Sequence, residues 1–315
     1  MPILISGSLA YDYIMDFPDS FKNHILPDQM HILNVCFVVD QLKKNFGGTA
    51  GNIAYTMKLL GGNPLILGTI GNDGNEYLHH LLAHGIAAEN ITQNKDTLTA
   101  SAHITTDKDD NQITAFFAGA NTRPADLPFP KNEKISFAII SPTHKDVMIR
   151  HAKECAERRI PFCFDPGQQI TALSPQELML LIGQAKFLVA NDYEMKMIEE
   201  KTGWGETELL NHVQTTITTL GEKGSIIRTK DEYITIDPCP PESVEDPTGA
   251  GDAYRAGFFS AYANGLPLET CGRVGSVAAV YAIESYGTQN HSFTHDEFAK
   301  RYEQTYHETL RLPLN

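Results

Sequence analysis

Short β-rich apolar runs alternate with amphipathic segments along most of this chain. The predicted strands are residues 3–6, 64–69, 137–141, 161–164, 187–190, 215–219 and 225–229. Several are apolar almost throughout, which is typical of strands covered on both faces in a parallel sheet. Helical patterns lie between them, at residues 52–60, 75–84, 146–158 and 174–184. The alternation predicts an α/β fold with a central, mostly parallel sheet and helices on both faces.

Two stretches break this alternation. Residues 11–45 contain a strand-like run at 32–37, and residues 97–117 have the pattern of a hairpin with strands at 99–106 and 113–117. A polar turn over residues 107–112 joins the two hairpin strands. Neither stretch has a helical pattern to pair with. We therefore predict a small β-sheet lid, formed by roughly residues 11–45 and 97–117, on a single domain spanning 1–315.

Composition excludes some classes of partner. The formal net charge of −14 argues against binding to duplex nucleic acid, which needs a basic surface. A nucleotide remains compatible, because backbone N–H groups and a metal ion supply a local positive field. The N-terminus has the pattern of a first strand, and no run approaches 18 apolar residues, so we expect a cytoplasmic protein without a membrane span. The five cysteines form no Cys-x-x-Cys pair, which is typical of free thiols in a reducing compartment.

The most informative string is DPTGAGDAYRAG at residues 246–257. Small residues at helical spacing follow it, so Gly249 and Gly251 lie on the entry turn of a predicted helix. Backbone N–H groups exposed there can bind an anion, and small side chains allow its close approach. Asp252 lies in the first turn, where a carboxylate beside an anion site can accept a proton from an attacking hydroxyl. The alternative is a glycine-rich turn capped by an aspartate.

This string is similar to the C-terminal signature of the ribokinase-like (PfkB) kinases, and FGGTAGNIA at 46–54 resembles their second signature. The resemblance implies a ribokinase-like fold and phosphoryl transfer from Mg-ATP to a primary hydroxyl. It makes Asp252 the general base and the turn Gly249, Ala250 and Gly251 the anion hole. It also implies nucleotide-side roles for Asn191, Glu194, Thr219, Gly221, Gly224 and Thr248, with Asn191 and Glu194 organising Mg²⁺ through water. Taken alone, residues 191–194 are an ordinary helix start and 219–224 a hairpin turn.

Within the family, the chain most resembles bacterial adenosine kinases. The supporting strings are GSLAYD at 7–12, FDPGQQ at 164–169, NDYE at 191–194 and DAYRAGF at 252–258. The resemblance implies a ribose pocket lined by Ser8, Asp12, Gly48 and Asn52, with Phe116, Gln168 and Gln169 near the purine. One position departs from the pattern: Ala102 stands where that group can stack a second aromatic residue from the lid.

These residues lead to three functional hypotheses. The first is an adenosine kinase that forms AMP, a purine-salvage reaction. The second is a sugar kinase for ribose or a ketohexose, which Ala102 favours and which Phe116 and the Gln168-Gln169 pair oppose. The third is a non-catalytic nucleoside-binding protein, which the intact glycine turn and Asp252 oppose.

The resemblance has two further implications. A monovalent cation such as K⁺ would bind near Asp246, Thr248 and Ser292, the alternative being a loop satisfied by its own hydrogen bonds. A homodimer would form through the lid, the alternative being a monomer whose lid folds back over its own substrate.

Overall fold

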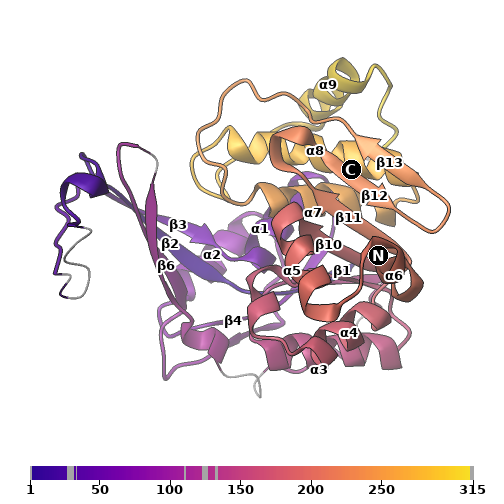
Figure 1. The fold of residues 1–315 in the computed structure, drawn as a ribbon, viewed down its shortest axis with the longest axis horizontal. Coiled ribbons are helices and arrows are strands. Elements are labelled where there is room, and N and C mark those ends of the chain that lie inside the picture. Colours follow the sequence, from indigo (N-terminus) through magenta and orange to yellow (C-terminus); the bar gives the residue numbers. More distant parts are fainter. Residues whose placement is uncertain are drawn as a thin grey trace.

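A long, mostly parallel sheet forms the centre of the computed structural model, which describes residues 2–26, 32, 34–109, 111–122, 127–131 and 134–312. Within these residues the strand order is β13-β12-β11-β10-β9-β8-β1-β4-β5 (Figure 1). The strands are β1 Ile3–Ser6, β4 Pro64–Ile70, β5 Ile91–Gln93, β8 Phe137–Ile140, β9 Phe162–Phe164, β10 Phe187–Asn191, β11 Thr215–Thr219, β12 Ser225–Arg228 and β13 Tyr233–Ile236. Pairing is parallel from β5 to β11 and antiparallel at β12 and β13.

Helices cover both faces of this sheet. One face carries α1 Thr49–Leu59, α2 Asn75–Ala83, α7 Ala250–Ala263, α8 Leu268–Ile283 and α9 His295–Tyr306, and the other carries α3 Lys145–Glu157, α4 Pro175–Gln184, α5 Asp192–Thr202 and α6 Glu206–His212. Strand β1 shows why the sheet is apolar on both sides. Ile3 and Ile5 pack into one core cluster, whereas Leu4 packs into the other. The predicted α/β architecture is confirmed.

The small sheet projects from one side of the body (Figure 1). It has the order β3-β2-β6-β7, formed by β2 Ala10–Asp16, β3 Gln41–Gly47, β6 Ala100–Thr106 and β7 Gln112–Phe117. We call these four strands and the chain segments at their outer ends the lid. The predicted hairpin is thus confirmed, although Asp110 of its turn lies outside the described residues. No helix in the described part of the chain is long and apolar enough to cross a membrane.

The strand predicted at 32–37 is wrong. Residues 34–37 form no strand, while Leu33 lies outside the described residues. Phe37 instead packs against Phe17 and Phe21, with ring centroids 4.9 Å apart in both pairs. Phe37 therefore joins an aromatic cluster rather than a sheet, whereas Ile32 at the start of the run is 66 % exposed. The strand actually used is β3, whose first four residues are exposed and give no alternating signal.

The expectation that no helix packs on the lid is also wrong in part. Tyr77 of α2 packs against Tyr11 of β2 and Phe46 of β3, with ring centroids 5.7 and 5.2 Å apart. His80, one turn further along α2, stacks on Phe46 at 3.9 Å. These contacts anchor the base of the lid to the body and leave its outer part projecting.

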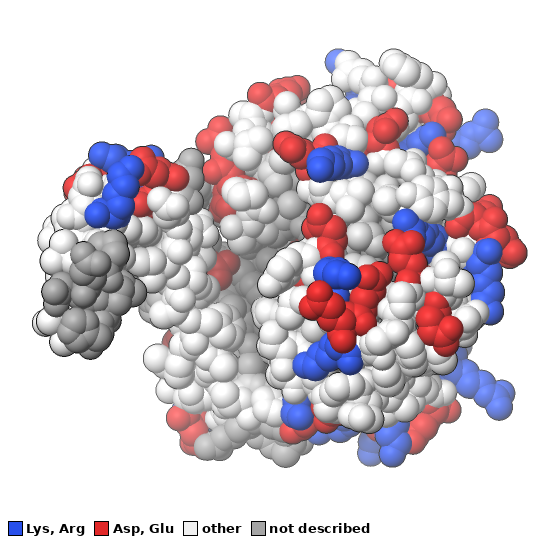
Figure 2. Space-filling view, viewed as in Figure 1, with Lys and Arg blue, Asp and Glu red and all other residues white. Residues whose placement is uncertain are grey.

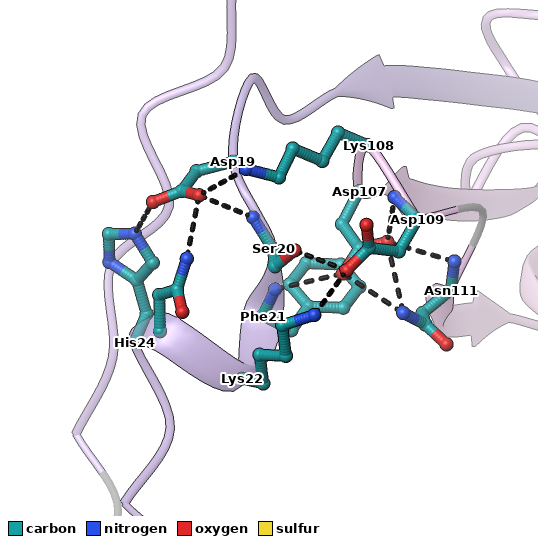
Figure 3. Close-up of polar contacts among 10 residues, drawn as sticks. Asp19, Ser20, Phe21, Lys22, His24, Asp107, Lys108, Asp109 and Asn111 are labelled. Atoms are coloured by element: carbon teal, nitrogen blue, oxygen red, sulfur yellow. Dashed lines mark hydrogen bonds and ion pairs between the residues drawn. The ribbon is translucent and has the colours of Figure 1, made fainter.

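Polar contacts hold the outer end of the lid together (Figure 3). The Asp107 carboxylate accepts hydrogen bonds from the backbone N–H of Phe21 at 2.8 Å and of Asn111 at 2.9 Å. Asp109 accepts from the Ser20 hydroxyl and from Lys22 Nζ, and these bonds lower the pKa of its carboxyl. The turn between β6 and β7 is thereby tied to the short helix η1, Phe21–Asn23.

Candidate active site

The glycine turn of residues 249–251 forms the N-terminus of α7. Gly249 has φ of 79°, which favours glycine, and a Cβ there would lie 2.9 Å from the Thr288 methyl carbon. No side chain caps this 14-residue helix, and the N–H of Ala250 makes a long hydrogen bond of 3.4 Å to Pro247 O, so a ligand can still reach the N–H groups at this end. The helix dipole adds a positive potential at the same point. The predicted position of Gly249, Ala250 and Gly251 at a helix entry is confirmed.

Asp252 lies in the first turn of α7 and is partly exposed. Its Oδ2 accepts a hydrogen bond from Asn52 Nδ2 at 2.8 Å. Desolvation by the surrounding protein raises the pKa of the Asp252 carboxyl to about 6, against the opposing effects of the Arg255 charge and the Asn52 hydrogen bond. A carboxylate with a pKa just below neutral is well matched to accepting a proton at physiological pH.

A buried ion pair lies next to this carboxylate. Arg255, one turn after Asp252, donates from its Nη2 to Oδ1 of Asp165 at 2.7 Å, and both side chains are less than a tenth exposed. Ser141 donates to the other oxygen of Asp165 at 3.1 Å. The guanidinium also passes beneath the glycine turn, since a Cβ on Gly251 would lie 2.7 Å from Arg255 Nη1. The pair thus joins α7 to the end of β9.

A row of side chains crosses the lid on the sheet face opposite the one that α2 contacts. Asp12 of β2 is paired in register with Asn45 on one side and Ala102 on the other, and Ala102 is paired with Phe116. Residues directly opposite each other point to the same face of a sheet. Ala102 therefore does occupy the position between Asp12 and Phe116, where an aromatic ring would have filled the row.

Asp12 is a buried carboxylate that accepts no hydrogen bond from the described part of the chain. Burial, and after it the charges of Asp246 and Asp252, raises the pKa of Asp12 to about 7. Gly47 allows the carboxylate to fit, because a Cβ there would lie 2.1 Å from Oδ2. A buried acceptor of this kind is suited to hydroxyl donors from a ligand.

A pocket of about 360 Å³ opens beside this row. Four predicted site residues line it, namely Ser8, Phe116, Gln168 and Gln169. Phe116 is 57 % exposed, so it is not a core residue of the hairpin. Figure 2 shows the lid standing off from the body, with the molecule hollowed between them and acidic and basic side chains intermingled over the face drawn.

The other lining residues were missed at the sequence level: Ala118, Asn121, Pro142, Thr143, His144, Lys145 and Ala172. Residues 142–145 follow directly after β8. Ligands in open α/β sheets bind beyond the carboxyl ends of the strands, so that position was the available signal. The Nζ of Lys145 lies 3.3 Å from Glu177 Oε1, so the positive charge of Lys145 is paired with a carboxylate in the pocket wall.

Two of the residues predicted for the ribose site, Gly48 and Ser8, contact backbone atoms of neighbouring segments. Gly48 has φ of 88°, and a Cβ there would lie 2.6 Å from the carbonyl oxygen of Ser8. Ser8 Oγ in turn accepts from the backbone N–H of Thr49 at 3.1 Å. The loop after β1 and the start of α1 are therefore held close together, directly beside the pocket.

The residues expected on the nucleotide side have clear local roles. Asn191 and Glu194 form a capping box at the start of α5, with each side chain bonded to the other's backbone N–H at 2.7 and 3.0 Å. Thr219, Gly221 and Gly224 lie at the β11–β12 connection, as predicted. Gly224 has φ of 83° and lies so close to β13 that a Cβ would be 2.0 Å from Ile236 O.

The Asp246 carboxylate accepts hydrogen bonds from backbone N–H groups. Asp246 Oδ1 accepts from the N–H of Thr248 at 2.9 Å and Oδ2 from that of Gly287 at 3.1 Å, whereas Ser292 is exposed. Among the described residues there is no group of three or more His, Cys, Asp or Glu arranged to hold a metal ion. The K⁺ site that the resemblance implied stays a prediction, and the loop's own hydrogen bonds are its alternative.

The fold and this constellation are those of a ribokinase-like kinase, and the sequence agrees. Residues 27–295 match the pfkB family carbohydrate kinases, and the chain belongs to that family. It is 33 % identical over 299 residues to a nucleoside kinase of Methanocaldococcus jannaschii, with 94 % of this chain and 95 % of the relative covered. The nucleoside kinase of Burkholderia thailandensis in complex with inosine superposes with a TM-score of 0.88 at 38 % identity, covering 98 % and 99 % of the two chains.

Proposed function

We propose that this protein is an ATP-dependent nucleoside kinase that phosphorylates the 5′-hydroxyl, with adenosine to AMP as the first choice of reaction. The observation that carries the proposal is the position of Asp252, in the first turn of α7 beside an uncapped helix N-terminus. The nucleoside kinase names of the M. jannaschii and B. thailandensis relatives support a nucleoside over a free sugar.

Different residues would act on the attacking hydroxyl and on the phosphates of ATP. Asp252 would take the proton from the attacking hydroxyl, and the N–H groups of the Gly249–Gly251 turn would stabilise charge on the transferred phosphoryl group. Asn191 is exposed and Glu194 partly exposed, and their carbonyl and carboxylate oxygens suit Mg²⁺ reached through water. When bound with ATP, Mg²⁺ would neutralise charge on the phosphate oxygens. Closure of the lid, within a single kinase domain, would exclude water.

The pocket suggests how the nucleoside is recognised. Asp12 would accept from two vicinal ribose hydroxyls, and Asn52 has a second amide N–H to give. Phe116 supplies an exposed aromatic face for a purine, while Gln168 and Gln169 offer both donors and acceptors. Ala102 leaves the second stacking position open, which is the one observation that favours the sugar-kinase alternative.

A substrate panel tests the function. With ATP and Mg²⁺, kcat/KM for adenosine and inosine is expected to exceed that for ribose and fructose, because only nucleosides fill the base side of the pocket. 2′-Deoxyadenosine is expected to lose about 1–3 kcal/mol, roughly 5- to 150-fold in kcat/KM, since the buried Asp12 would keep only one of its two hydroxyl donors. Free sugars outperforming nucleosides would establish the alternative, and equal values for the deoxy and ribo forms would remove Asp12 from the ribose site.

We also propose a homodimer through the lid. Strand β7 is an edge strand exposed along its whole length. On the lid face opposite Asp12, Leu42 and Ile113 lie in one row with Met15, and they are 64 % and 44 % exposed. An apolar face beside an unpaired edge favours association around a two-fold axis.

Light scattering at micromolar concentration is expected to give twice the 34.8 kDa chain mass. The substitution Ile113→Lys should return it to one chain mass, because a charge would then have to be buried in the contact. A wild-type mass of one chain, unchanged by nucleoside or salt, would show that the lid serves a monomer.

A further inference from the structure

A buried chain of hydrogen bonds reaches Asp252 from a backbone carbonyl, and its direction is fixed at every step. It begins at Gly47 O, which can only accept, so the Tyr77 hydroxyl must donate to it across 2.7 Å. The Tyr77 oxygen is then left as an acceptor, and Gln289 Nε2 donates to it at 2.7 Å. This sets which way round the Gln289 amide lies.

The orientation of the Gln289 amide in turn sets that of the Asn52 amide, the next group in this series of hydrogen bonds. Gln289 Nε2 also donates to Asn52 Oδ1 at 3.0 Å, while Gln289 Oε1 accepts from His80 Nε2 at 3.0 Å. Because the oxygen of Asn52 faces a donor, its Nδ2 must face the other way, and there it donates to Asp252 Oδ2 at 2.8 Å. The base is thus presented with an N–H group and never with a carbonyl oxygen.

Burial makes this arrangement hard to reverse. Tyr77, Gln289 and Asn52 are 0 %, 2 % and 5 % exposed, so turning either amide would leave buried polar atoms unpaired. Gly51 is needed for the approach, since a Cβ there would lie 2.0 Å from the Tyr77 oxygen and 2.8 Å from Gln289 Nε2.

Thr288 is an incomplete substitute for Gln289. Its hydroxyl lies 2.8 Å from Asn52 Oδ1 and 2.9 Å from Phe46 O, but one O–H can serve only one of these acceptors at a time. Gln289 has two amide hydrogens, one for Tyr77 and one for Asn52. It is therefore the constant donor to the Asn52 oxygen.

We propose that Gln289, oriented by Tyr77, is a positioning residue for the catalytic base: it holds the Asn52 amide so that Asp252 always receives an N–H hydrogen bond. The inference rests on the proposed function, in which Asp252 is the base. It assigns Asn52 a role toward the enzyme's own carboxylate besides any contact with the nucleoside. Neither Gln289 nor Tyr77 lines the pocket, so both act through Asn52.

The test uses two variants that keep side-chain size, Gln289→Met and Tyr77→Phe. Each is expected to lower kcat by roughly three- to tenfold, the worth of one lost hydrogen bond. KM for ATP should stay unchanged. Losing the N–H that favours the ionised carboxyl should move the acid limb of the kcat profile upward by about half to one pH unit.

A direct titration separates this inference from the proposed function. The Asp252 carboxyl is followed by ¹³C NMR in the wild type and both variants, with Asp252→Asn identifying the signal. An upward pKa change in the variants is expected whether or not the tested nucleosides are turned over. The two variants change none of the other charged or titratable groups near Asp252 or near the hydrogen bonds of Gln289, so these groups cannot cause the pKa change. They are Arg255 on α7, Asp165 after β9, Glu194 on α5, Asp12 on β2, Asp246 before α7 and His80 on α2.

Asn290→Ala is the matched control, because Asn290 is adjacent in sequence, exposed, and bonded to Tyr286 and Asn45 rather than to Asn52. It should leave both kcat and the Asp252 titration as in the wild type. An unchanged Asp252 pKa in folded Gln289→Met and Tyr77→Phe proteins would overturn the inference, as would an equal change in Asn290→Ala. Absence of nucleoside turnover in the wild type would instead count against the proposed function.

Discussion

Replacement of Asp252 by asparagine is expected to lower kcat at least ~10²-fold, the low end for a positioned general base. The amide keeps the size of the side chain and can still accept from Asn52 with its oxygen, so the fold and ATP binding should persist. What is lost is the group that takes the proton from the attacking hydroxyl. Steady-state kinetics with adenosine and inosine, beside ATP binding by calorimetry, measure the two effects separately.

The pH dependence supplies the control for this variant. In the wild type the carboxylate is ionised above its raised pKa of about 6, so kcat should fall as the pH drops through that value. Asp252→Asn should have low activity at all pH values and lack this acid limb. Near-wild-type turnover in a folded Asp252→Asn protein would mean that another group accepts the proton.

Replacement of Arg255 by methionine is expected to lower the free energy of unfolding by about 3–5 kcal/mol, the cost of removing one partner of a buried ion pair. Asp165 is 1 % exposed and would keep only the hydrogen bond from Ser141 to its side chain. Its carboxyl would then be a nearly uncompensated buried charge. Urea unfolding followed by circular dichroism measures the change.

The double variant Asp165→Asn with Arg255→Met tests the cause. Since it removes both charges, it should be more stable than Arg255→Met alone by a clear margin. Lys196→Met is a suitable control, because its ion pair with Glu199 is on the surface and Lys196 is 64 % exposed. Equal stability of the single and double variants would show that the loss comes from packing around α7 rather than from the charge left on Asp165.

Much of the architecture could be read from local pattern. Strands β1 and β11 begin and end at the predicted residues. In β1 the strand is buried on both faces and leaves an apolar string, whereas β11 is made of β-branched threonine and isoleucine. Helix α4 begins after Ser174, which forms the capping box that its sequence indicates. The glycine turn before α7 was likewise evident, since the special backbone at Gly249 is a property of the residue itself.

The lid was predicted less well, for a physical reason. Strand β3 is polar and exposed over most of its length, so only pairing with β2 makes it a strand. In the apolar run before it, Phe37 packs against other aromatic rings instead. Alternation of apolar and polar residues indicates which side of a strand is buried, and a strand with neither side buried has no such alternation.

The sequence by itself determined the class of fold, the glycine turn and the identity of Asp252, because each depends on residues close together in the chain. The environment of that carboxylate was decided only by the tertiary structure. Asn52 lies 200 positions before Asp252, and Asp165 lies 90 positions before Arg255. The direction of each hydrogen bond around the base depends on these partners, and no local pattern encodes which distant donors meet which acceptors once the sheet has brought α1, α7 and the 288–289 segment together.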